Sequence, residues 1–283
     1  MRLVICAAFA ASISSPLLAQ AQPTANALPS PEEVANRNTV TLAVGGAFVP
    51  DYEGSDDYRL IPAAAIRGKV NGISFTTRGT YLYVDVIPGN AKVDFDAGPI
   101  VGARFSTRRH IDDDVVKLLP NRKTTFEAGA FAGVSFHGVT NPYDSLGVRL
   151  DVVHGLGSGR GWTNFSPNVE FSTPVSRTTY ISASLGAEWA ANKYADYYFS
   201  ISPADSLRTG GVLPPFNADG GLKDWKAGLL INQSITGDLL HGLSIFGTGQ
   251  YSHLMGDFRR SPVVSQRGSA SQWLGAAGLA YTW

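Results

Sequence analysis

Apolar and polar residues alternate with a period of two along most of this 283-residue chain. A clear case begins at Val93, where Phe95 and Val101 share its face while Asp94 and Asp96 lie on the other. This period is typical of β-strands whose two faces meet different surroundings. The pattern predicts eleven strands, at residues 39–48, 58–67, 73–87, 93–105, 124–136, 146–154, 162–173, 178–191, 222–236, 243–253 and 271–283.

The last predicted strand carries large apolar and aromatic residues on one face, among them Trp273, Leu279 and Tyr281. It ends on Trp283, which is also the last residue of the chain. Aromatic residues at both ends of the apolar band are typical of outer-membrane barrels. The ending resembles the terminal strand that the bacterial barrel-assembly machinery reads, so we expect Trp283 to be an assembly signal and that machinery to be a partner. An edge strand of a soluble sandwich is the alternative.

The N-terminal segment predicts export. Residues 1–21 contain one basic residue, an apolar run and an A-x-A site ending at Ala21, as in a secretory signal peptide. The only cysteine, Cys6, lies in this segment, so the mature chain can form no disulfide of its own. Residues 22–38 are rich in Pro, Ala, Asn and Glu and predict a flexible periplasmic leader, which leaves 39–283 for the folded domain.

The predicted fold class is all-β, a transmembrane antiparallel up-and-down β-barrel in the outer membrane of a Gram-negative bacterium. After the signal segment no apolar run reaches the ~18 residues of a helical span, and lipid otherwise admits only closed barrels. Barrels with both termini in the periplasm have an even number of strands. We therefore predict about twelve strands, with ten as the alternative. The missing strand lies in 192–221, or segment 73–87 divides near Arg78.

The net charge of the chain excludes one class of function, and the positions of its charged residues predict what lines the barrel interior. Without the signal segment, 22 basic residues stand against 23 acidic ones, which excludes a strongly basic nucleic-acid binder. Alternation places these charged residues inside: Asp94, Asp96, Glu127, Asp151, Glu170, Glu188, Asp224, Arg59, Arg67, Arg78, Arg104, Arg149 and Lys226. In a narrow barrel opposite charges should pair and fill the lumen. A small channel is the alternative.

Candidate chemistry is sparse. A membrane phospholipase needs a Ser–His–Asn set because serine needs a base, and His154 with Ser158 and Asn164 comes nearest. A water-activating protease needs paired acids and a histidine, and His110 with aspartates 112–114 is one such cluster. A run of three aspartates in a polar loop is more often solvated surface than a functional site. Binding of a divalent cation, or a bridge to lipopolysaccharide, is the alternative role for these carboxylates. The other histidines lie at loop edges without a partner pattern: His137, His241 and His253. We therefore expect no catalytic residue, metal or cofactor.

Three motifs stand in a characteristic order. The first is Pro50-x-Tyr52-x-Gly54-Ser55 followed by Leu60-Ile61-Pro62. The second is Ala195-Asp196-Tyr197-Tyr198-Phe199-Ser200-Ile201-Ser202 with the later Gly210-Gly211. The third is Leu254-Met255-Gly256-Asp257 with Ser261-Pro262-Val263-Val264. Together they resemble the MipA/OmpV family of MltA-interacting proteins over roughly residues 40–283.

That resemblance implies an outer-membrane barrel, with outer-membrane lipid and lipopolysaccharide around it. For the best-known branch it implies a non-enzymatic scaffold that joins a lytic transglycosylase to a murein synthase, whereas other branches are described as porins or adhesins. One departure is visible, because Arg259 and Arg260 precede the Ser-Pro pair where the family often has an acidic residue.

Overall fold

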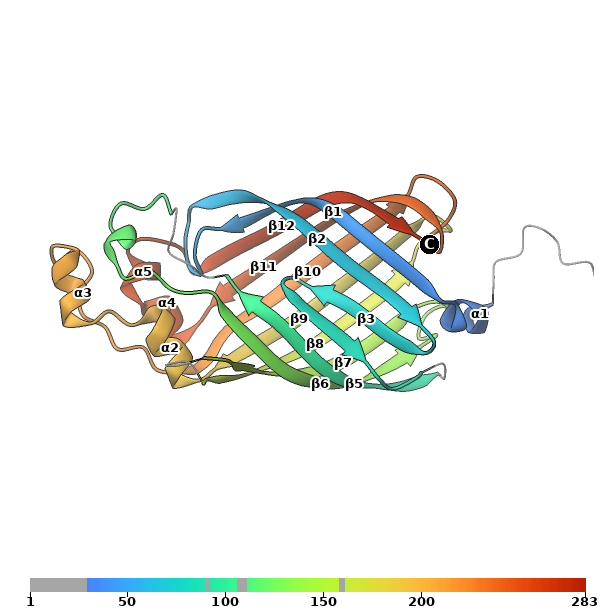
Figure 1. The fold of residues 1–283 in the computed structure, drawn as a ribbon, viewed down its shortest axis with the longest axis horizontal. Coiled ribbons are helices and arrows are strands. Elements are labelled where there is room, and N and C mark those ends of the chain that lie inside the picture. Colours follow the sequence, from blue (N-terminus) through green and yellow to red (C-terminus); the bar gives the residue numbers. More distant parts are fainter. Residues whose placement is uncertain (1–29, 90–91, 106–110, 158–160) are drawn as a thin grey trace, which may run out of the picture. The chain divides into compact units, whose positions relative to one another are not determined.

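The computed structural model describes residues 30–89, 92–105, 111–157 and 161–283, and the predicted signal segment 1–21 lies outside them. Within the described part, strands form one closed barrel with short helices at its ends (Figure 1). The strands are β1 (Thr39–Pro50), β2 (Tyr58–Val70), β3 (Ile73–Arg78), β4 (Tyr81–Asp85), β5 (Val93–Arg104), β6 (Thr125–His137), β7 (Ser145–Gly155), β8 (Thr163–Pro174), β9 (Thr179–Ala190), β10 (Gly221–Ser234), β11 (Gly242–Leu254) and β12 (Ser271–Thr282). The helices are α1 (Pro31–Asn36), the 3-10 helix η1 (Val116–Leu118), α2 (Asn192–Phe199), α3 (Pro203–Arg208), α4 (Gly256–Arg260) and α5 (Pro262–Ser265).

The sheet topology confirms the predicted antiparallel up-and-down barrel, with twelve strands rather than ten. Each strand pairs with its neighbours in sequence, and β1 pairs with β12 to close the sheet. The expected strand 73–87 is divided, because Gly79 adopts a left-handed turn conformation with φ of 59° after Arg78. The other explanation for the odd count is wrong, since residues 192–221 contain α2 and α3 instead of a membrane strand.

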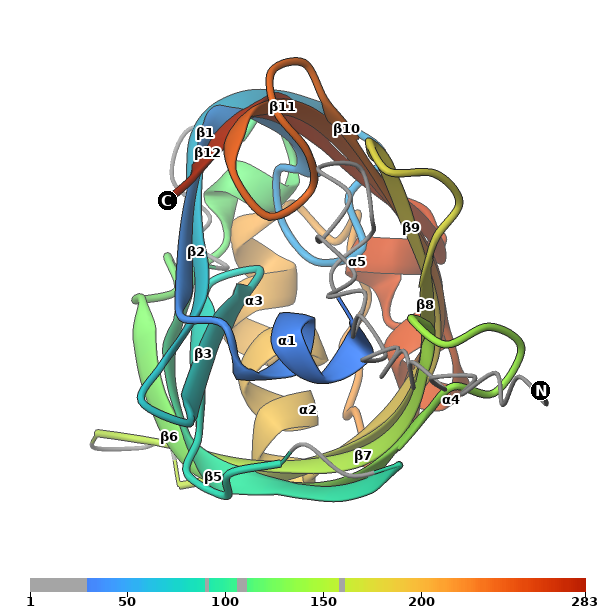
Figure 2. The ribbon, with the colours of Figure 1, turned by 90° about the vertical axis from the view of Figure 1, so that its right-hand side faces the viewer.

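The end of the expected leader is helical rather than irregular. Residues 31–36 form α1, and a proline at its first position fits because its fixed φ suits a helix start. Figure 2 shows α1 within the outline of one end of the barrel, and the last strand, β12, ends there too (Figure 1). We call this the terminal end, and the opposite end, where α2 to α5 lie, the capped end.

The barrel wall inverts the usual distribution of residues in a protein dissolved in water. Large apolar side chains such as Phe95, Phe126 and Leu185 are each more than 60% exposed on its outside. Carboxylates such as Glu127 and Asp151 are buried inside. No helix in the described ranges is long and apolar enough to cross a membrane. Outward apolar and inward polar faces are stable together when the outside meets lipid.

Aromatic clusters mark both edges of the apolar band. Near the capped end, the Tyr251 ring lies 5.3 Å from Trp225 and 4.9 Å from Trp273. Near the terminal end, the rings of Tyr281 and Trp283 are 4.7 Å apart. Along β12, the stretch from Trp273 to Tyr281 spans about 26 Å at strand rise, before tilt is considered. This spacing suits an apolar band about 25 Å tall.

The closing seam between β1 and β12 depends on two small residues. Gly45 and Gly278 are direct partners across this seam. A Cβ atom added to Gly278 would lie 2.1 Å from the backbone oxygen of Val44, so the two strands approach more closely than other residues allow. Beyond the last paired residues, the Trp283 N–H donates to the Val40 carbonyl at 3.0 Å. The role of Trp283 as an assembly signal stays a prediction.

The two strands of the hairpin β3–β4 are much shorter than the other strands of the barrel. The first strand of the hairpin pairs only with residues 67–70 of β2, so the part of β2 nearer the capped end has no β3 neighbour. Pro62 lies in that free part, opposite Gly46 of β1. A proline cannot donate to a ladder and is tolerated at such an edge. The first motif therefore continues into an incompletely paired part of the wall.

Candidate functional site: a cap over a buried charge network

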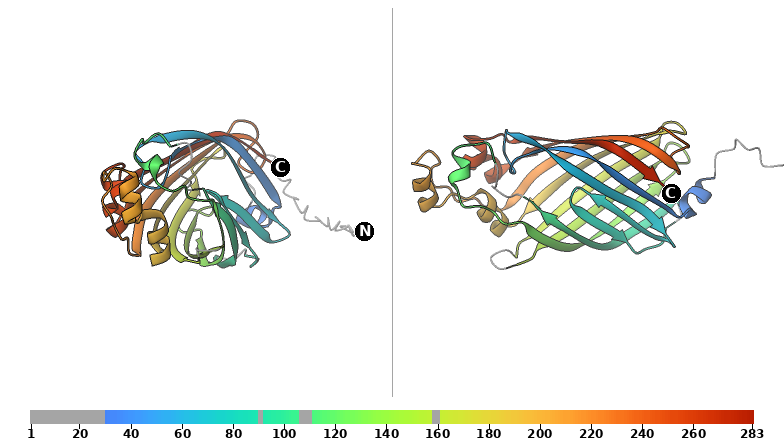
Figure 3. Two further views of the ribbon diagram at one scale, coloured as in Figure 1. Left: turned by 60° about the vertical axis from the view of Figure 1, so that its left-hand side comes forward. Right: turned by 45° about the horizontal axis from the view of Figure 1, so that its top comes forward.

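Four loops pack together at the capped end, comprising residues 51–57, 111–124, 191–220 and 255–270. They carry η1 and the helices α2 to α5, which gather at one end of the barrel in Figure 3. Their buried apolar side chains form one cluster with neighbouring strand residues: Tyr52, Ile111, Val116, Leu119, Trp162, Ala190, Tyr194, Ala195, Tyr198, Phe199, Ile201, Leu213, Ala218, Leu254, Phe258, Val263 and Val264. We call these four loops the cap.

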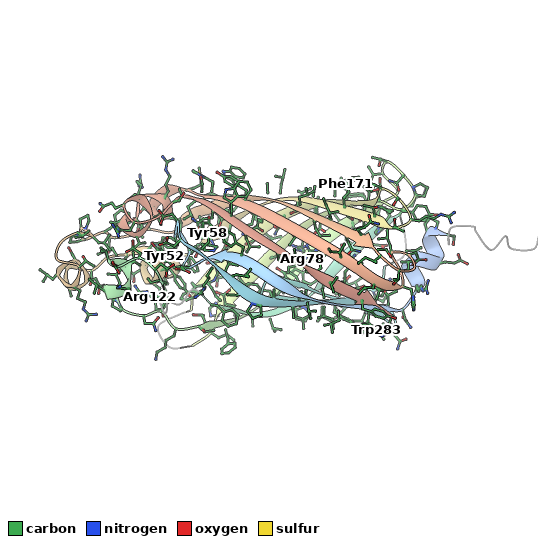
Figure 4. The ribbon with its side chains drawn as sticks, turned by 90° about the horizontal axis from the view of Figure 1, so that it is seen from above. Tyr52, Tyr58, Arg78, Arg122, Phe171 and Trp283 are labelled. Atoms are coloured by element: carbon green, nitrogen blue, oxygen red, sulfur yellow. The ribbon has the colours of Figure 1, made fainter. Side chains whose placement is uncertain are left out.

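The first motif joins the first loop to the last. Tyr52 is buried at the capped end (Figure 4), and its hydroxyl lies 2.7 Å from the Arg267 carbonyl and 3.2 Å from that of Val263. Gly54 has φ of 99°, and an added Cβ would lie 2.4 Å from the Val264 side chain. Both geometry and space therefore require glycine there. Pro50, the last residue of β1, lies directly before this loop.

Ser55 is fully buried and belongs to the same junction. Its carbonyl accepts a hydrogen bond from the Gln272 side chain at 2.9 Å, and the Gln272 Oε1 accepts one from the Gly54 N–H at 3.1 Å. The Ser55 hydroxyl accepts from the N–H of Asp57 at 3.0 Å. One glutamine of the last strand thus holds the first loop closed.

The second motif is the aromatic face of α2. Tyr198 and Phe199 are buried in the cap, whereas Asp196 is exposed. The Tyr198 ring lies 5.6 Å from the buried Trp162 and 4.8 Å from Tyr197. This aromatic group covers the mouth of the barrel.

The third motif locks the last loop onto α2. The Ser261 hydroxyl donates to the Phe199 carbonyl at 2.5 Å, and Pro262 begins α5. Phe258 of α4 meets Phe199 edge-on at 5.1 Å between ring centres. Arg260, at the departure from the family pattern, pairs with Asp257 of its own helix. The three motifs are distant in sequence and meet in one buried junction.

Directly beneath the cap lies a network of buried charges around Glu127. This carboxylate accepts hydrogen bonds from the Trp162 indole at 3.0 Å and the Tyr81 hydroxyl at 2.5 Å. The Arg104 guanidinium lies 3.3 Å from it and also donates to the Tyr194 hydroxyl of α2 at 3.0 Å. The network therefore connects the barrel wall to the cap.

Glu188 extends the network towards β10. It lies 3.5 Å from Arg104, 2.8 Å from Lys223 and 3.5 Å from Lys226. Lys223 is 2% exposed and also lies 2.6 Å from Glu53 and 3.3 Å from Asp224. One buried ammonium group thus meets three carboxylates, one of which comes from the cap.

Sequence reasoning missed Lys223 and Glu53. Strict alternation turns Lys223 outward, because Asp224 faces the lumen. A β-bulge between Leu222 and Asp224 shifts the register against β9 and turns Lys223 inward. Two charged residues in succession within an apolar–polar strand were the available signal. Glu53 carried no such signal, because a polar turn is its ordinary place.

The remaining predicted lumen charges have contacts of their own, some beside the cap and some farther along the barrel. Arg78, midway along the barrel in Figure 4, reaches Glu170 across the lumen at 2.5 Å. Arg149 instead pairs along its own strand with Asp151 at 2.6 Å. The other contacts are Asp94 with His137 at 3.3 Å, Asp96 with the Ser135 hydroxyl, Arg67 over the Tyr180 ring at 5.9 Å, Arg59 with Asp51 at 3.8 Å and Asp224 with Lys226 at 3.6 Å.

Electrostatics favour an ionised Glu53 in the cap. Burial alone would raise the pKa of this carboxyl, but Lys223 and Arg104 outweigh burial and hold the pKa below its usual range. Burial raises the pKa of Tyr194 well above normal, so this phenol stays protonated and donates to Glu53. A carboxyl with a depressed folded-state pKa contributes stability above its unfolded pKa, and that contribution is lost as pH falls through the folded value.

We therefore expect the first loop to stay protected from hydrogen exchange between pH 7 and about 5, and to lose protection below about pH 4. Exchange rates of residues 51–57, corrected for intrinsic pH dependence, measure this. Glu53→Gln should lower protection at neutral pH and remove the acid transition, while Asp56→Asn, at an exposed position of the same loop, should change neither. A transition already near pH 6 would contradict the assignment.

The described members of the catalytic sets considered from sequence have other contacts. His154 is exposed and contacts the Thr163 hydroxyl at 3.0 Å, whereas Asn164 is buried against Glu188 at 2.9 Å. Ser158 and His110 lie outside the described residues. In the acidic cluster, Asp113 accepts the N–H groups that begin η1 and pairs with Arg267, which is a structural role. Within the described residues, no three potential metal ligands lie together.

One serine–histidine pair was not anticipated. His253 and Ser271 are direct partners across β11 and β12, with Nδ1 to Oγ at 3.2 Å. The Tyr251 hydroxyl lies 2.9 Å from the same serine. Within the part of the chain that the structure describes, this imidazole contacts the hydroxyl groups of Tyr251 and Ser271. The acid or amide that orients a catalytic base is therefore not seen at this ring.

The fold and the lipid-compatible wall define an outer-membrane β-barrel whose mouth is capped by its own loops. Residues 42–283 match the family described as MltA-interacting protein MipA, and the chain belongs to this family. No curated protein matches the chain.

Several solved outer-membrane proteins are similar in fold at low identity. The COG4313 outer membrane channel from Pseudomonas putida F1 is 9% identical, with a TM-score of 0.45 over 91% of this chain and 97% of that one. A Vibrio cholerae OmpT lacking loop L8 is 7% identical, with a TM-score of 0.38 over 87% and 98%. A Pseudomonas aeruginosa FadL homologue is 10% identical, with a TM-score of 0.36 over 90% and 92%.

Proposed function

We propose that this protein is a non-enzymatic scaffold that docks murein-processing enzymes, a lytic transglycosylase and a murein synthase, at the outer membrane. The observation that carries the proposal is membership of a family described as MltA-interacting, over residues 42–283. The cap adds support, because loops and a buried ion network occupy the outer mouth. Partners of this class work on the periplasmic side, so the terminal end is the surface on which they would dock.

The terminal end offers a preformed docking loop between β6 and β7. Asp144 accepts hydrogen bonds from the N–H groups of Val139, Thr140 and Asn141 at 2.6 to 2.9 Å. Although burial opposes ionisation, these bonds and the Thr140 hydroxyl lower the pKa of Asp144 to about 2. The loop is therefore fixed at neutral pH and presents Val139, which is exposed. Two other turns share this end, 175–178 and 235–241.

Photo-crosslinkers at Val139 and Val175, both exposed, test the proposal in intact cells. Leu207 on α3 is the matched control, because it is exposed at the capped end. We expect Val139 and Val175 probes to capture a lytic transglycosylase or a murein synthase, and Leu207 probes to capture neither. If turn probes capture only the assembly machinery while Leu207 captures surface molecules, the adhesin alternative replaces the scaffold.

A small-solute channel is the second candidate. Its supporting observation is the lumen wall of β12 and β1, where inward positions are mostly small and uncharged, such as Ala276, Gly278 and Ala43. On the same inward face, the side chain of Leu274 is 37% exposed, so neighbouring residues do not cover it fully. Large, steady currents of the purified protein in planar bilayers would favour this candidate over the scaffold.

A further inference from the structure

The lipid-facing wall of β10, β11 and β12 contains a groove of about 490 Å³. Gly247 and Gly249 of β11 form its floor, with Ile231 and Leu229 as their partners on β10. A Cβ atom added to either glycine would meet no atom within 4 Å. The groove is therefore open space along the membrane surface, which other side chains could fill without a clash.

Aromatic residues bound this groove towards the capped end. Tyr251 and Trp273 line it, and their rings are 4.9 Å apart. They belong to the aromatic edge of the apolar band, where a lipid changes from its chain to its polar part. The groove thus begins at the interface and runs into the hydrocarbon region.

A polar cluster stands at the interface end of the groove. It consists of the Tyr251 hydroxyl, the His253 imidazole and the Ser271 hydroxyl, with contacts of 2.9 to 3.5 Å among them. The register places His253 opposite Ser271, one pair beyond Gln272 and two beyond Tyr251 and Trp273, so the cluster shares the outward face of the groove. Hydroxyl and imidazole groups match the hydroxyl, ester and amide groups of a lipid better than a bare phosphate, which arginine and lysine usually bind.

We propose that this groove binds one acyl chain of lipid A, with the polar cluster at the chain's hydroxyl group and its linkage to the sugar. The wall faces lipid. Outer-membrane barrels have short periplasmic turns and longer extracellular loops, so the capped end, which carries the long loops, adjoins the outer leaflet, where lipid A is the acylated component. A hydrogen-bonding cluster of hydroxyl and imidazole groups above an apolar groove matches a hydroxylated acyl chain. A phospholipid chain and a second copy of this protein are the competing occupants.

Native mass spectrometry of the mature protein, refolded with lipid A and phosphatidylethanolamine together, tests this assignment. Gly249→Leu fills the groove floor, and Gly247→Leu is a second filling variant should the first fold poorly. Ala132→Leu is the matched control, because it places the same leucine side chain at an exposed, lipid-facing position on β6. We expect wild type and Ala132→Leu to retain one lipid A per barrel, and both groove variants to retain at least ten-fold less.

The polar cluster is tested separately with Ser271→Ala and His253→Phe, which should weaken lipid A retention while leaving the groove open. Equal retention by wild type and folded groove variants would overturn the site. Equal occupancy by phosphatidylethanolamine would overturn the lipid A assignment, and a wild-type dimer that Gly249→Leu converts to a monomer would assign the groove to a second copy.

Discussion

Replacing Lys223 with methionine is expected to lower the free energy of unfolding by about 3–5 kcal/mol, the usual effect of removing one partner from a buried ion network. The ammonium group of Lys223 lies within 3.3 Å of Glu53, Glu188 and Asp224. Without it, Glu53 loses its closest cation and the other two keep only more distant ones. Urea unfolding in lipid vesicles, followed by tryptophan fluorescence, measures the change.

Lys226→Met is the matched control for this substitution. Lys226 contacts two of the same carboxylates at 3.5 and 3.6 Å, but its side chain is 25% exposed. Solvent screens such a group, so its loss should cost about 1 kcal/mol or less. Equal destabilisation by both substitutions would contradict the central role assigned to Lys223.

Gly278→Val is expected to prevent most of the protein from closing its barrel, with a cost of about 3 kcal/mol or more from overpacking. The Cβ atom would lie 2.1 Å from the Val44 carbonyl oxygen across the β1–β12 seam, so the final strand pairing would have to separate. Electrophoretic mobility before and after heating measures the fraction that refolds into vesicles, and we expect this fraction to fall at least ten-fold.

Gly275→Val on the same strand is the control. A Cβ atom at Gly275 would lie 3.7 Å from the nearest atom, the Thr248 carbonyl oxygen, and would face lipid. This substitution should leave the folded fraction nearly unchanged, because it adds apolar surface where apolar surface is favoured. Loss of folding in both variants would show that β12 tolerates no added bulk, whatever the seam geometry.

The candidate site was only partly accessible from sequence. The motifs identified Tyr52, Tyr198 and Ser261, but gave no role, because their contacts join loops that are far apart in the chain. Those loops meet once barrel closure places their ends on the same rim. The inward position of Lys223 could not be predicted from the alternation of apolar and polar residues alone. A β-bulge turns one residue to the other face of the strand without changing the alternation on either side of it.

The sequence alone determined the fold class, the even number of strands and which faces meet lipid. Alternation is a local property of each strand, and lipid accepts only strands that close into a barrel. Tertiary structure decided how segment 73–87 divides, how the cap forms and where the seam and the lipid-facing groove lie. Each of these depends on register and close approach between strands or loops distant in sequence, as for Gly45 and Gly278. Such distances are set only when the barrel closes.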